Sequence, residues 1–519
     1  RMIRFVTLLL FFSLSVPVFC QFTNIVIGET DMPNEPSIAI NPKNTAQMVA
    51  GANIKLFYHS SDSGYTWQQG QLTSTYGVYG DPCIIADTAG NFYFFHLSDP
   101  VAGNWLDRIV CQKSVNGGQT WSNGSYAGLN GNKDQDKEWA VVDPANNNIY
   151  LTWTEFDSYG SSNHNDSTNI LFSKSSDAGL SWSVPARINR VAGDCLDMDS
   201  TVEGAVPAVG PAGQIYVSWA GPAGLVFNRS LDEGTTWLDS NIFVSDIPGG
   251  WDYAIPGIYL ANGLPVTCCD LSNGPHRGNI YINWSDQRNG EEDTDIWFKK
   301  STDGGLTWES LVRINNDPPG KQQFFTWMTV DQVSGFIYIV FYDRRDLPGN
   351  LTDVYLALSK DGGSTFENFR ISESPFNPVP QIFFGDYTNI SAHNGIVRPV
   401  WARQSVSEIS IVTAVVDRIN TGTGHKPPSI ASLSMDQNYP NPGKEKTYIS
   451  FRLHRTSPVT LKVYDLYGQE IALIIDNQIM ESGKYVRSFD IAAHRLSAGI
   501  YYFSLVSGEE SLIRKMIVE

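Results

Sequence analysis

Basic residues and cysteines are scarce in this chain. Its 519 residues include 36 Lys and Arg against 54 Asp and Glu, which gives a formal net charge of −18. Because no basic stripe is present to neutralise phosphates, we do not expect a nucleic-acid partner. The six cysteines show no regular spacing, which argues against a disulfide framework or a metal motif. One bridge, from Cys195 to Cys268 or Cys269, stays open.

Sequence motifs for cofactors are also missing. There is no phosphate-binding glycine loop and no nucleophilic serine elbow, and His164, His276 and His393 are isolated. The acidic run 289–295 is rich in oxygen ligands but lacks the spacing of a calcium loop. A solvated loop is the better interpretation. We expect no cofactor and no metal site, with a structural calcium ion as the open alternative.

A long apolar segment occurs only near the N-terminus. Arg4 precedes the apolar run 5–20, which is too short to span a bilayer. This pattern is typical of a signal peptide for the Sec pathway. We predict that it covers residues 1–20 and that Gln21 follows the cleavage site. We expect no transmembrane helix elsewhere.

An eight-residue pattern, Ser-x-Asp-x-Gly-x-Thr-Trp, recurs at intervals of 54 to 71 residues. Its six copies carry at the third position Asp62, Asn116, Asp177, Asp232, Asp303 and Asp361. An Asp two residues before a Gly indicates a tight turn, because the carboxylate accepts backbone N–H groups and the glycine takes a positive φ. Each copy follows a run rich in β-branched and aromatic residues, so we predict a hairpin turn between two strands. A repeat of this size indicates one supersecondary unit used many times.

These copies resemble the Asp-box, or bacterial neuraminidase repeat (BNR), of the sialidase-like β-propellers, with Asn116 and Phe366 departing from the consensus. The resemblance spans about residues 22–420 and implies blades of four strands. We count seven inner strand pairs and six boxes, and therefore predict seven blades. The segment 22–28 would supply the missing outer strand of the last blade. Six blades, as in the sialidases themselves, are the alternative.

The C-terminal part differs in pattern. After the propeller, residues 21–418, a Gly/Thr/Pro-rich linker spans 419–432, and alternating apolar strands with glycine turns over 433–519 predict a small β-sandwich. Its motifs, among them 437–442 and 496–501, resemble the type A C-terminal sorting domain of the type IX secretion system of Bacteroidota. The resemblance implies the secretion machinery as a partner and export across the outer membrane to the cell surface or medium. A carbohydrate-binding or fibronectin-like sandwich is the alternative.

Acidic residues stand where the inner strands of several predicted blades begin. Glu35, Asp81 and Asp386 fall at one equivalent position of blades 1, 2 and 7, which ring closure makes neighbours, and Glu138 lies near the same level. Carboxyl groups that converge at a cleft are candidates for general acid catalysis. The alternative is that they cap strand ends or hold a structural cation.

Arginines follow the second strands of three blades. Arg288, Arg344 and Arg403 would open on the same face and could clamp a substrate carboxylate. The resemblance implies such a triad in sialidases. The alternative is that the arginines pair with Asp286 and Asp343 as braces between blades.

A sialidase also uses a tyrosine nucleophile, because a carboxylate would repel its anionic substrate. Tyr387 is a catalytic candidate on this ground, with Tyr342 and Tyr253 as the other options. The family's Phe/Tyr-Arg-Ile-Pro motif is absent, and the first unit has residues 32–36, Met-Pro-Asn-Glu-Pro, in its place. Aromatic side chains that could stack on sugars, or simply pack, are Trp105, Trp251, Phe324, Phe325 and the substrate-binding candidate Trp327.

The sequence therefore predicts a secreted, monomeric, all-β protein that acts on extracellular glycans or glycoproteins. If it is an enzyme, the resemblance implies a glycoside hydrolase of the exo-α-sialidase type. The alternative is a non-catalytic surface propeller that binds glycans or proteins.

Overall fold

The computed structural model describes residues 22–404, 408–417, 433–435, 437–453, 456–466, 468–507 and 510–519. The predicted signal peptide and the predicted linker lie outside the described residues. The chain divides into two compact units, Arg1–Ile419 and Asn420–Glu519. None of the described residues forms a helix long and apolar enough to cross a membrane.

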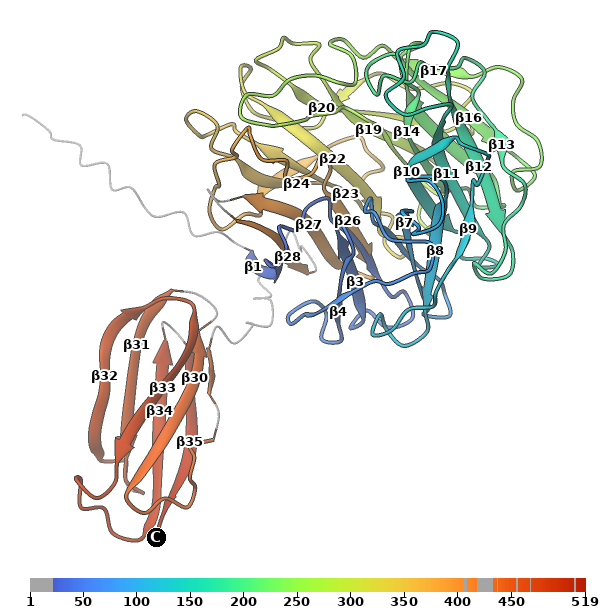
Figure 1. Cartoon of the computed structure of the whole chain (residues 1–519). Coiled ribbons are helices and arrows are strands. Elements are labelled where there is room, and N and C mark those ends of the chain that lie inside the picture. Colours follow the sequence, from blue (N-terminus) through green and yellow to red (C-terminus); the bar gives the residue numbers. More distant parts are fainter. Residues whose placement is uncertain are drawn as a thin grey trace, which may run out of the picture. The chain divides into compact units, whose positions relative to one another are not determined.

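The larger unit consists of seven antiparallel sheets of four strands, which confirms the seven-bladed propeller (Figure 1). The first three blades are β2 (Ser37–Ile40), β3 (Met48–Ala52), β4 (Leu56–Ser60) and β5 (Gln68–Gln71); β6 (Cys83–Ala86), β7 (Phe92–Leu97), β8 (Ile109–Ser114) and β9 (Ser125–Ala127); and β10 (Asp134–Val142), β11 (Ile149–Phe156), β12 (Thr168–Ser175) and β13 (Ala186–Arg187). Blades 4 and 5 are β14 (Glu203–Val209), β15 (Ile215–Ala220), β16 (Leu225–Ser230) and β17 (Ile242–Ser245); and β18 (Val266–Cys269), β19 (Ile280–Asp286), β20 (Asp295–Ser301) and β21 (Val312–Arg313). Blades 6 and 7 are β22 (Gln323–Val330), β23 (Ile337–Asp343), β24 (Asp353–Ser359) and β25 (Glu367–Arg370); and β26 (Asn389–His393), β27 (Ile396–Gln404), β28 (Ile409–Asp417) and β1 (Thr23–Gly28).

The ring is closed by the N-terminal strand. β1 pairs with β28 in antiparallel register, with Thr23 opposite Val415 and Val26 opposite Val412. The first and last blades therefore lie side by side, and the innermost strands pack in the cyclic order β2, β6, β10, β14, β18, β22, β26. The prediction that segment 22–28 completes the seventh blade is confirmed.

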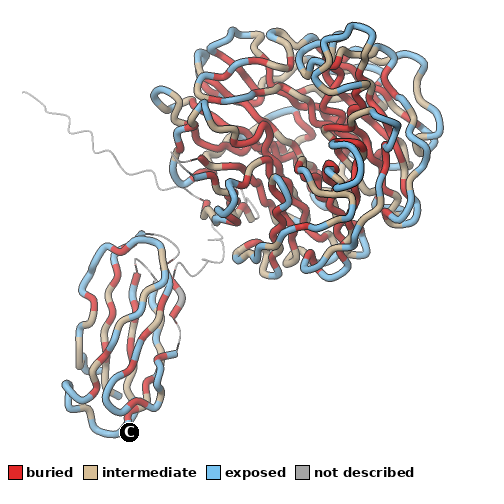
Figure 2. The backbone as a smooth tube through the Cα atoms, in the orientation of Figure 1, coloured by how far each residue is buried: buried red, intermediate tan, exposed pale blue. Residues whose placement is uncertain are grey.

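The blades pack through their middle strands. β7, β11, β15, β19 and β23 are buried along their whole length, and Figure 2 shows the buried backbone running through the blades with exposed loops at their ends. Four second strands, β11, β15, β19 and β27, each place a fully buried indole between blades: Trp153, Trp219, Trp284 and Trp401. Such large apolar side chains on both faces of a sheet stabilise face-to-face packing.

Three of the inner strands contain a β-bulge near their start. β10, β14 and β22 each contain a bulge, which shifts the register just before Trp139, Val206 and Trp327, respectively. A bulge adds one unpaired residue and re-aims the side chains around it. The bulge in β10 includes Lys137 and follows Asp136, two residues of the candidate site described below.

The Asp-box turns join the third and fourth strands of six blades, as predicted. In the first box Asp62 Oδ1 accepts the backbone N–H of Thr66 at 2.9 Å and Oδ2 accepts its hydroxyl at 2.6 Å. The Ser60 hydroxyl donates to Asp62 and accepts the N–H of Gly64. In the second box Asn116 keeps the same bonds to Thr120 through its amide oxygen and nitrogen. The Asp-box carboxylates are therefore structural.

The smaller unit forms two sheets around its own core. One has the order β29 (Leu433–Met435), β30 (Lys446–Leu453), β33 (Gly483–Asp490), and the other β32 (Glu470–Met480), β31 (Ser457–Tyr464), β34 (Gly499–Ser507), β35 (Glu510–Val518). The side chains between the sheets include Phe451, Leu461, Phe489 and Phe503. This is the small β-sandwich that the alternation predicts.

The cysteines of the described part are all free. Cys83, Cys111, Cys195 and Cys269 are buried and Cys268 is half-buried. The bridge from Cys195 to Cys268 or Cys269 is not formed, and most of these thiols serve as small apolar side chains in the core.

The Asp-box bonds give a test of stability. Burial alone would raise the pKa of Asp62, but the hydrogen bonds from Thr66, Ser60 and Tyr65 outweigh it and lower the pKa. Asp62→Ala should lower the free energy of unfolding by about 1–2 kcal/mol at pH 7, and Asp62→Asn by less, because Asn116 shows that an amide can make these bonds. The Asp62 contribution is present at neutral pH and is lost as the pH falls below about 4. Urea unfolding of the full chain at pH 7 and pH 3.5 measures both effects, and equal losses for the two variants at pH 7 would contradict this account.

Candidate functional site

Each of the first three blades has a residue with a left-handed backbone just before its inner strand or near the start of that strand. Glu35, Asp81 and Lys137 have φ values of 50°, 51° and 50°. Side chains other than glycine rarely adopt this conformation, and such strain concentrates at functional sites. The common conformation turns the two carboxylates and the ammonium toward one place on the propeller axis.

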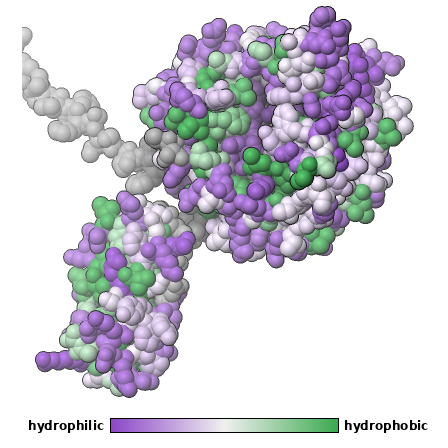
Figure 3. All heavy atoms as spheres, in the orientation of Figure 1, coloured by the Kyte–Doolittle hydropathy of each residue, from purple (hydrophilic) through white to green (hydrophobic). Residues whose placement is uncertain are grey.

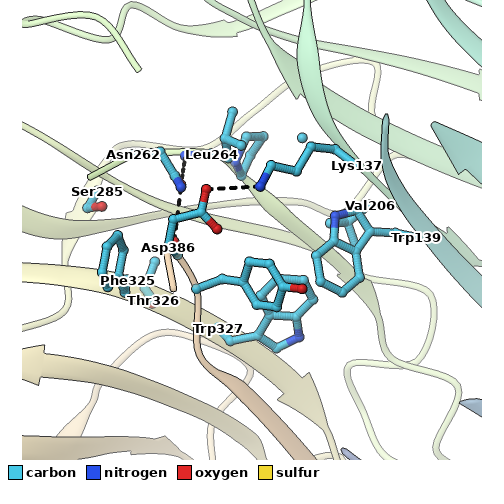
Figure 4. A pocket seen from close by; sticks show the side chains of 13 residues that line it. Lys137, Trp139, Val206, Asn262, Leu264, Ser285, Phe325, Thr326, Trp327 and Asp386 are labelled. Atoms are coloured by element: carbon cyan, nitrogen blue, oxygen red, sulfur yellow. Dashed lines mark hydrogen bonds and ion pairs between the residues drawn. The ribbon is translucent and has the colours of Figure 1, made fainter. Parts of the chain in front are cut away.

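Lys137 pairs with carboxyl groups from the second blade and the seventh blade. Its Nζ lies 2.9 Å from Asp386 Oδ2 (Figure 4) and 3.7 Å from Asp81 Oδ2. Burial alone would lower the pKa of Lys137, but Asp386, Asp81 and Glu35 raise it well above its usual value. Lys137 is therefore a permanent cation at the centre of the acidic cluster.

Glu35 completes this cluster. Its Oε2 accepts a hydrogen bond from Asn53 Nδ2, and Asn53 Oδ1 accepts the backbone N–H of Asp81 at 2.8 Å. Burial, followed by the charges of Asp81 and Asp386, raises the pKa of Glu35 well above its usual value. The predicted convergence of Glu35, Asp81 and Asp386 is thus present.

Aromatic rings close the axis beneath the cluster. The Trp139 and Trp327 rings are tilted by 51° to each other with centroids 4.3 Å apart, and Tyr387 packs edge-on against Trp139 at 5.2 Å (Figure 4 labels the two indoles). The Tyr387 hydroxyl has no hydrogen-bond partner among the described residues. Burial raises the pKa of Tyr387 well above its usual value. Only a space of about 20 Å³ remains between these rings and Asp386, enough for one water.

Above the cluster lies a cavity of about 420 Å³. Its walls include five aromatic side chains, Tyr79, Trp105, Tyr159, Trp251 and Phe383. Trp105 is 41% exposed and stands edge-to-face between Tyr79 and Tyr159, at 5.4 and 5.8 Å. Figure 3 shows a largely hydrophilic surface with separate apolar patches. A cavity of this size with a few rings and convergent polar groups suits a small ligand or one end of a polymer.

The cavity is strongly acidic. Besides Glu35, Asp81 and Asp386 it is lined by Asp136, Asp197, Glu203 and Asp252, and Lys137 is the one Lys or Arg among the described residues that line it. Sequence reasoning missed Asp136, Lys137, Asp197 and Glu203. Asp136 and Lys137 belong to a bulge that the alternation does not reveal, and Asp197 lies on the long connection between β13 and β14.

The three predicted arginines do not line the cavity. Arg288 pairs with Asp286, and Arg403 Nη2 donates to Ser374 Oγ at 2.7 Å. Arg344 is 3% exposed, donates to Pro256 O and Thr352 Oγ1, and stacks on Phe324. The neighbouring Arg345 pairs with Asp343 at 2.6 Å. The bracing interpretation describes Arg288 and Arg345, and a triad of the predicted arginines is not assembled.

The remaining candidates are placed in the core or at its edge. Tyr342 donates to Ala402 O at 2.6 Å and Tyr253 bonds Ser285 Oγ, also at 2.6 Å, so neither hydroxyl is free. Phe324 and Phe325 are buried against Tyr342. Trp251 is largely buried at the cavity wall, where its Nε1 donates to Thr201 O. Of the aromatic side chains named from the sequence, Trp105 is the exposed one in the cavity.

The acidic run 289–295 is exposed over residues 289–292 and buried over residues 293–295. Asp293 accepts the backbone N–H of Gly320 at 2.7 Å, and Asp295 bonds Asn289, Arg313 and Asn315. Within the part of the chain that the structure describes, no group of three or more His, Cys, Asp or Glu residues is arranged to hold a metal ion.

Comparison with known families assigns the smaller unit. Residues 437–519 match the secretion system C-terminal sorting domain. This domain directs the protein across the outer membrane to the cell surface or the extracellular space. No curated protein sequence matches the chain.

The solved structures to which the chain is similar include a protein of unknown function, a sialidase and a polysaccharide lyase. A protein of unknown function from Dyadobacter fermentans has 12% identity and a TM-score of 0.44, covering 78% of this chain and all of its own. The NanB sialidase of Streptococcus pneumoniae has 10% identity and a TM-score of 0.44, covering 78% and 95%. A PL25 ulvan lyase has 13% identity and a TM-score of 0.48, covering 76% and 96%. With its Asp-box turns and four-stranded blades, the larger unit has a sialidase-like propeller fold, and such a fold hosts many functions.

The buried acid Glu138, next to Lys137, gives a pH test of the cluster. Its side chain is 1% exposed, and neither oxygen has a partner among the described residues. Burial, followed by the Asp81 charge, raises its pKa well above the usual 4.5. The folded state therefore holds this proton more tightly than the unfolded state, so stability falls as the pH rises above about 4.5.

We expect Glu138→Gln to reduce this loss, so that its Tm relative to the wild type increases between pH 5 and pH 8. Calorimetry across this range measures the difference. The exposed Glu29→Gln is the control and should track the wild type. Wild-type and Glu138→Gln curves that stay parallel would show that Glu138 does not titrate in this way.

Proposed function

We propose that the secreted propeller acts on extracellular glycans and that its axial cavity receives the sugar. The observation that carries this proposal is the convergence of Glu35, Asp81 and Asp386 on Lys137 at the base of an aromatic-walled cavity. Aromatic faces stack on sugar rings, while carboxylates accept hydrogen bonds from sugar hydroxyls. Delivery outside the cell by the sorting domain agrees with such a substrate.

Within this function, hydrolysis is the form that the carboxyl groups support. A glycosidase needs one protonated carboxyl to donate to the leaving oxygen and one ionised carboxylate to assist attack at the sugar carbon. Glu35, with its raised pKa, fits the acid, and Asp81 or Asp386, held by Lys137, fits the carboxylate. We therefore propose a glycoside hydrolase that uses these groups.

The charge of the cavity disfavours an anionic sugar. A sialoside carboxylate would meet seven acidic residues and a single lysine that is already paired with Asp386. Tyr387, the tyrosine beside the cluster, lies below the cavity among Trp139 and Trp327. Neutral or positively charged sugars suit the cavity better than sialic acid does.

Non-catalytic binding is the second candidate function. Lys137 holds Asp386 in a buried ion pair, and such a pair can serve structure alone. In that case the aromatic wall would bind a glycan that the acids do not cleave.

A glycoside panel tests the catalytic form. We expect the full chain to cleave a neutral or amino-sugar glycoside and not a sialoside. Asp81→Asn and Glu35→Gln should each lower kcat/KM by about 10²–10⁴-fold, while Arg403→Ala should stay within about twofold. Cleavage of a sialoside that disappears in Arg344→Ala would contradict this proposal and support the arginine triad. Binding without turnover of any member would leave the non-catalytic function.

The exposed indole of Trp105 tests sugar stacking. Trp105→Ala should weaken binding of the best glycan about tenfold, a loss of about 1.4 kcal/mol. Trp121→Ala serves as the control indole, because Trp121 does not line the cavity and packs against Phe57 and Phe94. Isothermal titration with each variant gives the affinities. An unchanged affinity for Trp105→Ala would place the sugar elsewhere.

A further inference from the structure

One wall of the cavity carries three acids that the ion pairs of Lys137 do not include. Asp136 lies on β10, Glu203 begins β14, and Asp197 lies on the connection before β14. These acids come from blades 3 and 4, whereas Glu35, Asp81 and Asp386 come from blades 1, 2 and 7. The wall adjoins the cluster proposed for catalysis, because Asp136 directly precedes Lys137, and burial, followed by the charge of Asp81, raises the pKa of Asp136.

Glu203 is an uncompensated carboxyl. Its side chain is fully buried at the cavity wall, and both of its oxygens lack a hydrogen-bond partner among the described residues. Burial, followed by the charge of the neighbouring Asp197, raises the pKa of Glu203 well above its usual value. Two carboxyl groups this close either share a proton or need a cation, because an unpaired buried charge is costly.

The protein supplies no second cation for this wall among the described residues that line the cavity. Lys137 is 2.9 Å from Asp386 and is committed there. A positively charged ligand would complete the charge balance. An ammonium group is such a ligand, because carboxylate oxygens accept charge-assisted hydrogen bonds from it.

The surroundings of these acids also favour an ammonium group. The Tyr159 hydroxyl donates to Asp197 Oδ2 at 2.6 Å, and its ring stands beside Trp105. Trp251 lines the same cavity. Carboxylates beside aromatic faces bind organic cations through charge-assisted hydrogen bonds and cation–π contacts.

We propose that Asp136, Asp197 and Glu203 form an ammonium subsite, and that the glycan taken by this cavity contains amino sugars with free amines. Asp136 and Asp197 bond the ammonium, and Glu203 adds a third carboxyl from beneath. This inference rests on the proposed function, because it names the class of sugar that the cavity takes.

The test compares two ligands that differ only in their amines. The full chain is titrated calorimetrically with a β-1,4-linked glucosamine tetrasaccharide and with its fully N-acetylated counterpart, at low and moderate salt. We expect the free amine form to bind at least tenfold more tightly, with a preference that shrinks as salt screens the charges. Equal affinities would overturn the subsite.

Variants of the wall residues test which side chains cause the preference for the free-amine ligand. Asp197→Asn should lower affinity for the glucosamine ligand about tenfold and leave the acetylated ligand within twofold, and Glu203→Gln provides a second, independent variant of the same wall. Asp239→Asn removes one exposed carboxylate that does not line the cavity and should change neither affinity. A loss for both ligands in Asp197→Asn would indicate damage to the cavity rather than a lost ammonium contact, and would overturn the assignment.

The outcomes separate this inference from the proposed function. If both ligands bind equally and Trp105→Ala weakens both, the glycan site stands and the ammonium subsite is wrong. If neither binds, the amino-sugar assignment fails, and the wider glycoside panel decides the function. If a lysine-containing peptide binds as tightly as the glucosamine ligand, the subsite recognises protein ammonium groups and the sugar assignment is wrong.

Discussion

The pairing of β1 with β28 is the constraint on which the site depends. A propeller blade that lacked its outer strand would expose an unpaired edge, and the N-terminal strand covers that edge while joining the two ends of the domain. The same closure places blade 7 beside blade 1. Asp386 then meets Glu35 and Asp81 across the seam, although 351 and 305 residues separate them in sequence. The acidic cluster is thus a product of the long-range strand pairing.

The repeat made most of the fold predictable. Each Asp-box is a local turn whose bonds lie within a few residues, as the contacts of Asp62 with Ser60 and Thr66 show, so its sequence carries its structure. The equivalence of Glu35, Asp81 and Asp386 followed from aligning the units. The seventh blade has no Asp-box because its outer strand comes from the N-terminal segment and is not joined to the third strand by a hairpin turn.

The rest of the site depends on features without a local signature. Lys137 looks like one charged residue in an acidic stretch, and only the bulge between Asp136 and Trp139 sends it to the axis. Asp197 reaches the cavity from an irregular connection whose path is set by packing. For the arginines the local sequence was informative. Asp286 lies two residues from Arg288 and forms an ion pair with it, so Arg288 is not available to a substrate. Closeness in sequence therefore predicted the Arg288–Asp286 pair. Which charged residues line the cavity depends instead on the three-dimensional fold.

The central claim is that the axial cavity is where the glycan binds. A crystal structure of the full chain soaked with the tightest ligand from the glycoside panel tests it most directly. The account predicts a sugar ring in the cavity, stacked near Trp105, with a hydroxyl or amine within hydrogen-bond distance of Asp81, Asp386 or Asp197. A sugar bound on the Asp-box face or at a blade edge, with the cavity unoccupied, would contradict it.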